Sequence, residues 1–517
     1  MATVSVFDAL PPKTGLVPKH DWTDRLVVGI ALVAVAGLFL LNLCELSFVD
    51  PDLWHEMALA RESLELGRLP LEDRFAYTPT VYPVVHHEWG NGAILYVVAT
   101  TLGAPGIMAL KYTLTAAIAG LCFYIARRRG ASTVTIVSLV PAIILAGCYG
   151  FTTIRAGLFT MLFLAALLAM LDRDRHGDRR WMALWLPLFV VWLNVHAGFV
   201  VALAVVATHA LEQYVRQRPW LHLAALEAAM LALVAVNPYG LDYYPYLLEA
   251  VTMDRPMILE WAPLWKNDPT TFLVYLVSVL IVVYALQKAG WRRMPGLFVL
   301  SLMAYAALRH TRHLSLYFVV WLCYVPAWLE ATPLATLMVR VWHRRRAWVA
   351  GFAAVVSIVS LAACLPRAPW RMRVPVTLAD ELTGRPMYPA GAVEYLERAD
   401  FRGNMMVPFV PGGYVMWKLH PKVKVSLDGR YEVAYRPGIL EENEALYRAH
   451  DGWQATLTKY ATDLVLVPRS TQLAEVIGSA DGWHRVYRDG AYELYARPGL
   501  DLAAVDHGDE TIKASFP

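Results

Sequence analysis

Eleven apolar stretches restrict the fold of this chain more than any other feature. They fall at about 26–48, 106–126, 131–149, 155–171, 181–196, 197–214, 220–237, 269–287, 294–308, 314–332 and 347–365. An α-helix needs ~20 apolar residues to cross the hydrocarbon core of a bilayer, and most of these stretches approach or reach that length. Only 17% of the residues are charged, whereas soluble chains average about 25%. We therefore expect a polytopic α-helical membrane protein with about eleven transmembrane helices.

The distribution of basic residues predicts how these helices are oriented. With Lys13, Lys19 and Arg25 in the cytoplasm, the short inner loops hold 16 basic residues and the longer outer segments hold eight. This is the positive-inside pattern of a multi-pass membrane protein. The inner residues are Arg127, Arg128, Arg129, Arg173, Arg175, Arg179, Arg180, Arg216, Arg218, Lys288, Arg292, Arg293, Arg340, Arg344, Arg345 and Arg346.

A shorter apolar stretch, 91–103, is separated from the next one by Gly103-Ala104-Pro105-Gly106. Its length of about 13 residues is short for a span, so we expect an interfacial or re-entrant helix. Counting it as a span would move Arg127–Arg129 to the outside and spoil the alternation of charge. Eleven spans also place everything after residue 366 outside the cytoplasm.

The composition changes once, near residue 366. We expect a transmembrane domain over 1–366, with a first outer loop at 49–90, and an extracytoplasmic soluble α/β domain over 367–517. In the second region short apolar runs alternate with helix-like stretches, which indicates a short sheet. The runs are Met405–Val410, Val423–Leu427, Asp463–Val467 and Tyr492–Tyr495, and the helix-like stretches are Gly391–Ala399, Leu440–Ala449, Trp453–Ala461 and Gln472–Ala480.

Net charge and cysteine placement argue against several other classes. The net charge of +3 is too small to indicate nucleic-acid binding. All five cysteines, Cys148 among them, lie in or beside apolar stretches, so we expect neither a disulfide framework nor a thiolate metal site. The first 25 residues lack the order of a cleaved signal peptide, and the first span is expected to be a retained anchor.

The first outer loop begins with acidic residues at the membrane surface, where a carboxylate is costly unless it has a task. Its first residues are Val49-Asp50-Pro51-Asp52-Leu53-Trp54-His55-Glu56, and it closes with His86-His87-Glu88-Trp89. Asp52, His55 and Glu56 share a face if Leu53–Leu66 is helical. Asp50 or Asp52 could instead be only the N-cap of that helix. The histidines and the acid that close the same loop favour a functional site.

A basic cluster, Arg309-His310-Thr311-Arg312-His313, lies at the outer end of the ninth span, against the positive-inside bias. On a helix, Arg309, Arg312 and His313 share one face, which would suit a phosphate. The alternative is that the arginines snorkel to lipid headgroups. Arg155, at the outer mouth of the fourth span, is a weaker candidate of the same type.

Other polar residues are less specific. Asn194-Val195-His196 lies between two spans and either lines a cavity or joins neighbouring helices by hydrogen bonds. Glu260-Trp261 could contact a sugar, although interfacial tryptophans are common in membrane proteins. Asp428-Gly429-Arg430 and Pro411-Gly412-Gly413 are expected to be turns.

The chain contains no Walker loop, Rossmann glycine pattern, HExxH motif or nucleophile elbow. A nucleotide-driven pump, a dehydrogenase and a serine hydrolase are therefore disfavoured. An activated donor for an outward-facing site would have to be carried by lipid.

The first outer loop resembles that of bacterial GT-C glycosyltransferases, polytopic enzymes related to protein O-mannosyltransferases and the lipid A aminoarabinose transferase. The resemblance rests on Asp50-Pro51-Asp52-Leu53-Trp54-His55, Ala60-Arg61-Glu62, Gly67-Arg68-Leu69-Pro70 and His87-Glu88-Trp89. In that family an acid precedes an Arg-Glu pair by nine or ten positions, as Asp52 precedes Arg61-Glu62. A second acid near the end of the loop corresponds best to Glu88, so the resemblance implies that Asp52 and Glu88 are the catalytic acids. The Lys-Pro-Pro or His-Pro-Pro motif of the family is replaced by His86-His87-Glu88-Trp89, and the stretch 412–430 is similar to the tail of many bacterial relatives.

The resemblance implies a GT-C-like fold and an inverting transfer of sugar from a polyprenyl-phosphate donor to a glycan, lipid or protein acceptor. Asp52 would take the proton of the acceptor hydroxyl. Arg309 and Arg312, together with His313 or a divalent cation, would stabilise the leaving phosphate. The resemblance also implies a location in a bacterial inner membrane.

The further candidates for contacts with substrate are Arg155, His55, His87, His196 and Glu260, and a cation could be held by Asp52, His55 and Glu88. Two other functions stay open. The chain could be a transporter or flippase for lipid-linked glycans, although the inverted repeats of such proteins are not visible. It could also be a non-catalytic component of a polysaccharide assembly system.

Overall fold

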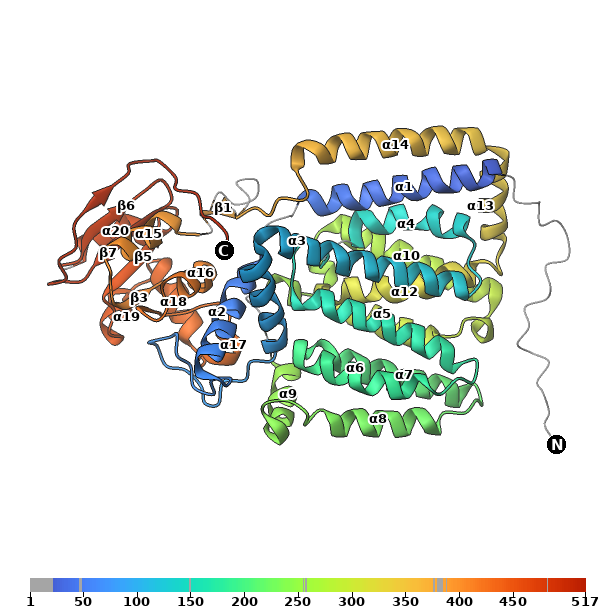
Figure 1. The fold of residues 1–517 in the computed structure, drawn as a ribbon, viewed down its shortest axis with the longest axis horizontal. Coiled ribbons are helices and arrows are strands. Elements are labelled where there is room, and N and C mark those ends of the chain that lie inside the picture. Colours follow the sequence, from blue (N-terminus) through green and yellow to red (C-terminus); the bar gives the residue numbers. More distant parts are fainter. Residues whose placement is uncertain are drawn as a thin grey trace.

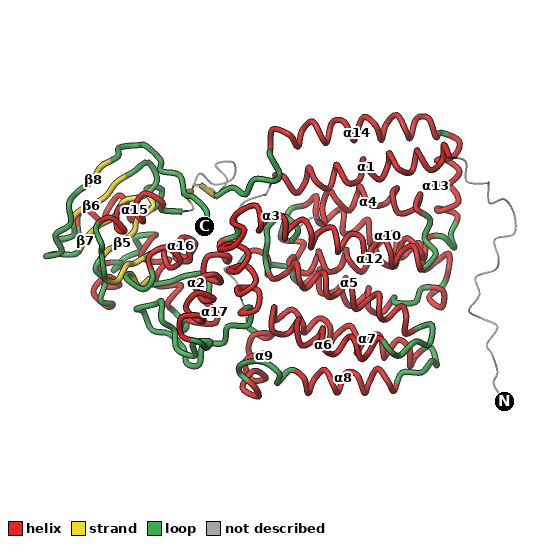
Figure 2. The backbone as a smooth tube through the Cα atoms, viewed as in Figure 1, coloured by secondary structure: helices red, strands yellow, loops and turns green. Residues whose placement is uncertain are grey.

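The computed structural model of the chain describes residues 22–45, 49–147, 150–253, 255, 258–374, 377–378, 385–386, 388–480 and 482–517. Lys13, Lys19 and Cys148, which enter the predictions above, lie outside these residues. The described chain forms a bundle of roughly parallel helices and, at one end of that bundle, a smaller unit that contains the sheet (Figures 1 and 2).

Each of the predicted apolar stretches contains a helix that covers most of its described residues. A helix satisfies its interior backbone groups by itself, which makes it the stable form of an apolar segment in lipid. The helices are α1 (Trp22–Glu45), the second part of α3 (Trp89–Arg128), α4 (Thr133–Gly147), α5 (Ala156–Asp174), α6 (Trp181–Val195), α7 (Val200–Val215), α8 (Leu221–Leu233), α10 (Pro269–Ala289), α11 (Leu297–Arg309), α12 (Leu314–Leu329) and α14 (Arg346–Arg367). The shorter helices between them are α2 (Pro51–Leu66), α9 (Tyr243–Thr252) and α13 (Pro333–Arg344).

Among the described residues, six helices are long and apolar enough to cross a membrane, and a bent pair raises the number to seven. The pair is Thr311–Leu329 with Pro333–Arg344, which bends by 85°. Thr133–Ile144, Trp181–Val195, Leu221–Leu233 and Leu297–Arg309 are also apolar but shorter. A multi-pass membrane architecture is therefore supported, whereas the predicted number of eleven spans is not confirmed, because these four helices fall below the required length.

The stretch 91–103 is joined to the following span instead of being separated from it by a loop. Both belong to α3, a bent helix of 40 residues. The bend is at Gly103, where the backbone is non-helical with φ 61° and ψ −157°, and Pro105 follows it. Glycine adopts a positive φ without strain, and proline cannot donate the helical hydrogen bond. The break thus lies where the Gly-Ala-Pro-Gly sequence predicted it.

The loops expected on opposite sides of the membrane lie at opposite ends of the bundle. Arg129 donates a hydrogen bond to the carbonyl oxygen of Pro295, so the loops after α3 and α10 meet at one end. At the other end, beside the C-terminal unit, Arg155 contacts Asp50 and Glu260 from two predicted outer loops. Which end faces the cytoplasm stays a prediction.

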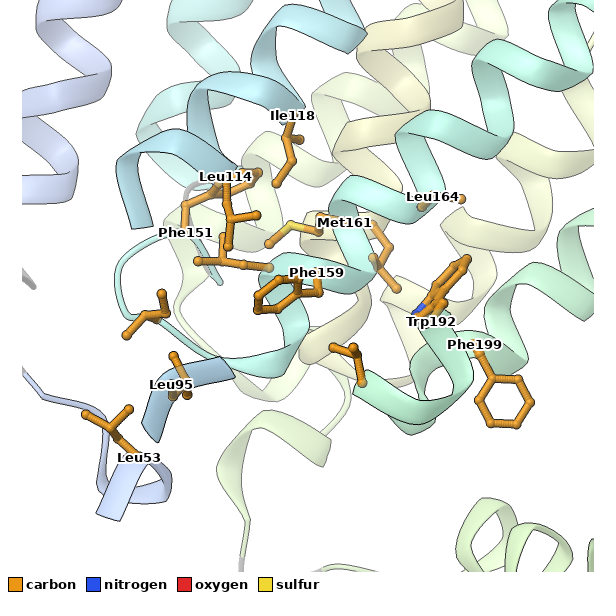
Figure 3. Close-up of a cluster of buried hydrophobic side chains, with 14 of the residues drawn as sticks. Leu53, Leu95, Leu114, Ile118, Phe151, Phe159, Met161, Leu164, Trp192 and Phe199 are labelled. Atoms are coloured by element: carbon orange, nitrogen blue, oxygen red, sulfur yellow. The ribbon is translucent and has the colours of Figure 1, made fainter. Parts of the chain in front are cut away.

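The bundle core fixes the helices whose outer ends carry the candidate residues. Figure 3 shows Leu114 of α3 close to Phe151, with Phe159 and Met161 of α5 beside them. These side chains are buried, as is Trp192 of α6. The packing holds α5 and α6 in place, and Arg155 and His196 stand at their outer ends.

The C-terminal unit is an α/β structure around a six-stranded sheet with the strand order β4-β3-β5-β7-β6-β8. β3 is parallel to β4 and β5, β7 is antiparallel to β5 and β6, and β8 is parallel to β6. The strands are β3 (Gly403–Met406), β4 (Val423–Val425), β5 (Leu464–Pro468), β6 (His484–Arg488), β7 (Tyr492–Ala496) and β8 (Val505–Asp506). The helices are α15 (Ala390–Arg398), α16 (Phe409–Leu419), α17 (Tyr431–Ala434), α18 (Ile439–Tyr447), α19 (Gln454–Lys459) and α20 (Gln472–Val476). A separate pair, β1 (Thr377–Leu378) and β2 (Arg385–Pro386), precedes them.

Each of the four predicted strands has a counterpart in β3, β4, β5 and β7. The prediction of a turn at Pro411-Gly412-Gly413 is wrong, because these residues lie inside α16. α16 is buried, and its glycines allow close approach of neighbouring backbone, so their role is packing and not chain reversal. The strand β6 was not expected, since its sequence His484–Arg488 is rich in polar residues.

The first outer loop packs against the C-terminal unit. Residues 75–77 run beside β4, where the N–H of Val425 donates to the carbonyl oxygen of Phe75 (2.9 Å) and the N–H of Tyr77 donates to that of Val425 (3.2 Å). β4 is the end strand of the sheet, so this segment covers an edge that would otherwise be open. Residues 49–90, assigned above to the transmembrane domain, are therefore also in contact with 367–517.

Candidate functional site

A cavity of about 1050 Å³ lies where α2, the adjacent ends of the bundle helices and the C-terminal unit meet. The candidate residues that line it are Asp52, His55, His87, Glu88, Arg155, His196, Glu260, Arg312 and His313. Leu59, Met161, Leu302 and Leu316 give other parts of the wall an apolar character. Side chains from five predicted outer segments are thus brought to one cavity, and Arg309 is not among its lining residues.

The first turn of α2 places Asp52. Pro51 occupies the first helical position, and Asp50 caps the helix by accepting a hydrogen bond from the N–H of Asp52 (3.1 Å). Gly67 ends the helix with φ 67°, so α2 ends at Leu66 as its sequence predicted, whereas it starts at Pro51 and not at Leu53. From the sequence, either acid could be the N-cap of the helix or part of a functional site. The structure shows Asp50 as the N-cap and places Asp52 in the lining of the cavity.

Arg155 stands between three carboxylates. Its guanidinium lies 2.7 Å from Asp52, 3.3 Å from Asp50 and 3.3 Å from Glu260. These acids come from the first outer loop and from the segment before α10, so the arginine joins distant parts of the chain. Its positive charge is already matched by these acids, which makes Arg155 better suited to hold Asp52 than to bind a free phosphate.

The environment of the helix start changes the acidity of two neighbours of Asp52. Burial raises the pKa of Asp50 to about 6, although the charge of Arg155 acts in the opposite direction. Thr153 donates a hydrogen bond to the same carboxyl group (2.9 Å). Burial lowers the pKa of His55, against the opposing effect of Asp52. The imidazole beside Asp52 is therefore neutral at pH 7.

Glu88 is the centre of a hydrogen-bond network. Its Oε1 lies 3.2 Å from Nε2 of His196 and 3.4 Å from Nε2 of His87. A carboxylate can only accept, so both Nε2 atoms donate. The Nδ1 atoms contact the hydroxyls of Thr160 (2.6 Å, to His196) and Tyr246 (2.7 Å, to His87). Burial opposes the ionisation of Glu88, but the two histidines outweigh it and hold its pKa well below the ordinary value.

Glu56 is a further member of this network. It is buried and hydrogen-bonded to Glu88, and it accepts a hydrogen bond from the amide of Asn91. Burial and the negative charge of Glu88 raise the pKa of Glu56 well above its ordinary value. The pair therefore carries one proton, on Glu56, and Glu88 carries the negative charge that faces the cavity.

Arg312 and Trp261 line another part of the cavity. The guanidinium carbons of Arg255 and Arg312 lie 4.3 and 4.4 Å from the ring centroid of Trp261. Arg255 also forms an ion pair with Glu432, whereas Arg312 lies 3.9 Å from Glu260, a distance at which the charge is only weakly matched. Arg312 is thus the cation of this cavity with most capacity left for a ligand.

The prediction that Arg309, Arg312 and His313 share one helical face is wrong. α11 ends at Arg309, and His310 has an extended backbone with φ −143° and ψ 120°. A new turn of 3₁₀-helix starts at Thr311, and it brings Arg312 and His313 to the cavity while Arg309 stays exposed outside it. The side chain of His310 accounts for this break, since its Nδ1 contacts the carbonyl oxygen of Trp261 (2.7 Å).

The three possible metal ligands do not form a metal site in this arrangement. Within the described residues, no group of three or more His, Cys, Asp and Glu side chains is placed to hold a metal ion. Asp52 is ion-paired with Arg155, His55 faces Gly429, and Glu88 is bonded to histidine. The positive charge next to Asp52 is therefore that of an arginine, and a role of a divalent cation stays a prediction.

Several residues of the cavity were not selected from the sequence. Thr160 and Tyr246 lie within helices, where nothing distinguishes them from packing residues, and they are recognised only by their bonds to His196 and His87. Arg430 was included in an expected turn. It does follow β4 in a turn, but it also lines the cavity.

The comparisons with known proteins bear on the fold. No protein-family model and no curated protein sequence matches the chain. The crystal structure of the apo form of the oligosaccharyltransferase from Archaeoglobus fulgidus matches it with a TM-score of 0.56 and 13% sequence identity. The match covers 94% of this chain and 75% of that one. The two proteins share a fold. This agrees with the GT-C-like architecture expected from the first outer loop, and at 13% identity it says nothing of substrate.

Proposed function

We propose that this protein is a membrane glycosyltransferase that moves a sugar from a polyprenyl-phosphate-linked donor to a hydroxyl of an envelope glycan, lipid or protein. The observation that carries the proposal is the position of Asp52. It lies at the start of α2 in a cavity that also holds Arg312, within a fold shared with an oligosaccharyltransferase. The site and the C-terminal unit would then face the extracytoplasmic side of the membrane.

Asp52 would act as the general base. The acceptor hydroxyl attacks the anomeric carbon while Asp52 takes its proton, and the bond from that carbon to the phosphate oxygen breaks on the opposite face. This sequence inverts the anomeric configuration. Arg155 would hold the carboxylate in place, because it donates to Asp52 at 2.7 Å and is itself fixed by Asp50 and Glu260.

Arg312 would stabilise the charge that develops on the leaving phosphate. It lines the cavity, stacks on Trp261 and is only weakly paired with Glu260. A guanidinium can bind two phosphate oxygens at once. The apolar wall near Leu302 and Leu316 would take the first part of the lipid chain.

Glu88 would serve in positioning and not as a second base. Its pKa is held low by His196 and His87, so its affinity for a proton is weak. A carboxylate with a fixed orientation is instead suited to accept hydrogen bonds from sugar hydroxyls. The sequence suggested a catalytic function for both Asp52 and Glu88, and we now propose it for Asp52 alone.

The experiment is a comparison of purified wild-type protein with Asp52→Asn, supplied with polyprenyl-phosphate sugars and with envelope glycan as acceptor. Loss of a general base should lower the transfer rate by roughly 10²- to 10⁴-fold while folding is retained. Asp178→Asn is the matched control, because Asp178 is exposed, does not line the cavity and accepts a hydrogen bond from the N–H of Arg180 that asparagine can also accept. Near-normal transfer by Asp52→Asn would remove Asp52 from this function. Movement of a lipid-linked glycan without a new glycosidic bond would favour the transporter instead.

A further inference from the structure

The turn Asp428-Gly429-Arg430 reaches from the C-terminal unit to the first turn of α2. Gly429 lies so close that a methyl group added to it would be 2.9 Å from Nδ1 of His55 and 3.3 Å from Oδ1 of Asp52. Gly429 and Arg430 both line the cavity. The two polar side chains at the start of α2 therefore have the backbone of the C-terminal unit as an immediate neighbour.

A buried ion-pair network holds this turn. The guanidinium of Arg430 donates to both carboxylate oxygens of Asp428 (2.9 and 2.7 Å) and to Asp73 (2.6 Å). Tyr435 donates another hydrogen bond to Asp428 (2.6 Å). Burial opposes the ionisation of Asp428, but Arg430 outweighs it and lowers the pKa of Asp428 to about 2. Since Asp73 belongs to the loop after α2, the network ties the turn to the same loop that carries Asp52.

A second contact fixes the same arrangement. α16 crosses the start of α2 at Gly413, where an added methyl group would lie 3.5 Å from the carbonyl oxygen of Pro51 and 3.6 Å from the nitrogen of His55. At Gly412 such a group would overlap the carbonyl oxygen of Leu427, at 2.0 Å. Glycine permits these approaches because it has no Cβ. The C-terminal unit therefore meets α2 through backbone, which leaves little freedom in their relative position.

The far end of α2 is held by the Arg-Glu pair that the family resemblance singled out. Arg61 lies over the ring of Trp417, 4.5 Å from its centroid, and donates to the carbonyl oxygen of Trp417 (2.9 Å). Glu62 lies 3.0 Å from Nε2 of His420. Both ends of α2 are thus docked on α16 and on the residue that follows it.

We propose that the Asp428-Gly429-Arg430 turn is a positioning element of the reaction, which sets the place of Asp52 and His55. Nδ1 of His55 is buried and has no hydrogen-bond partner among the described residues, so contact with Gly429 limits where this ring can lie. Gly429 also limits where the carboxylate of Asp52 can lie, both by its own closeness to Asp52 and by holding the ring of His55. The inference rests on the proposed function and adds to it a reason why the C-terminal unit is needed for activity.

Gly429→Ala in the full-length protein tests the inference. The added methyl group must displace His55 or Asp52, and a displacement of the order of 1 Å can cost roughly 10²-fold in rate. We expect the rate of transfer to fall by about 10- to 100-fold with little change in the KM for the lipid-linked donor. Gly478→Ala is the matched control, because a methyl group there meets nothing within 4 Å and the backbone is not left-handed.

Two further measurements test whether Gly429→Ala displaces Asp52 and His55. They distinguish this effect from general unfolding and from failure of the proposed function. Hydrogen exchange of the peptide that covers 50–60 should be faster in Gly429→Ala than in wild type or Gly478→Ala, with other peptides unchanged. In a His55→Ala background the clash with the ring is removed, so Gly429→Ala should have less effect there than in wild type. Unchanged exchange at 50–60 overturns the inference whether or not transfer is detected. Absence of transfer by the wild-type protein refutes the proposed function alone, since the exchange experiment still decides the inference.

Discussion

Replacement of Glu88 by glutamine should be far more damaging than the same replacement of Glu56, although the two form one hydrogen-bonded pair. The structure places the proton of the pair on Glu56 and the charge on Glu88. Glu56→Gln puts an amide N–H where a carboxylic O–H donates and leaves the charge of Glu88 intact. Glu88→Gln removes the charge that His87 and His196 face at 3.4 and 3.2 Å.

The magnitude follows from the type of hydrogen bond. A bond to a charged group contributes about 1.5–3 kcal/mol and a neutral one about 0.5–1.5 kcal/mol, so each histidine contact loses about 1 kcal/mol in Glu88→Gln. The two histidine contacts together lose about 2 kcal/mol. At ~1.4 kcal/mol per tenfold, transfer should fall roughly 30-fold. Glu56→Gln should stay within about fivefold of wild type.

The assay is turnover with a saturating lipid-linked donor, together with thermal unfolding of each variant in the same detergent. Glu88→Gln should also unfold at a lower temperature than Glu56→Gln, because the bonds it weakens join α3, α6 and the segment before α7. Equal effects of the two substitutions, or a larger effect of Glu56→Gln, would refute the assignment of the proton to Glu56.

Two more outcomes are expected. Arg312→Ala should lower the affinity for the donor roughly 10- to 100-fold, equivalent to about 1.5–3 kcal/mol. Arg309→Ala should change this affinity less than about twofold, because the side chain of Arg309 lies outside the cavity. If a titration with donor shows equal losses for the two variants, Arg309 belongs to the donor site. The pKa of Asp50 is raised to about 6, so its contribution to stability is present below about pH 4 and is lost as the pH rises through 6. Protonation of Asp50 also removes one partner of Arg155, which then binds Asp52 more strongly and makes it a weaker base. Transfer should therefore decline below pH 6, and a pH profile of Asp50→Asn that keeps this decline would contradict the assignment.

The sequence by itself determined the helical stretches of the bundle and the C-terminal end of α2. Apolar length predicts a membrane helix from local composition alone, and Pro51, the acidic cap and Gly67 act within a few residues of where they stand. The interval between Asp52 and Arg61-Glu62 could also be recognised in the sequence. These residues lie near the two ends of one helix, so local structure alone sets the distance between them.

Nine of the ten candidate residues line one cavity, and Arg309 is the exception. The failure at Arg309 is a failure of helical periodicity. The rule that residues three positions apart share a face holds only while the helix continues, and the contact of His310 with Trp261 ends it. That contact joins segments 49 positions apart, so it cannot be predicted from the local sequence pattern.

Only the tertiary structure decided the chemistry assigned to each acid. Asp52 and Arg155 are 103 positions apart, and Arg430 and Asp73 are 357 apart. Whether a carboxylate is an N-cap, a protonated donor, an anchored anion or a free base depends on such partners and on burial, because these set its pKa and orientation. The acids from which the site is built were therefore recognisable in the sequence, while long-range contacts determined which of them carries a charge toward the cavity.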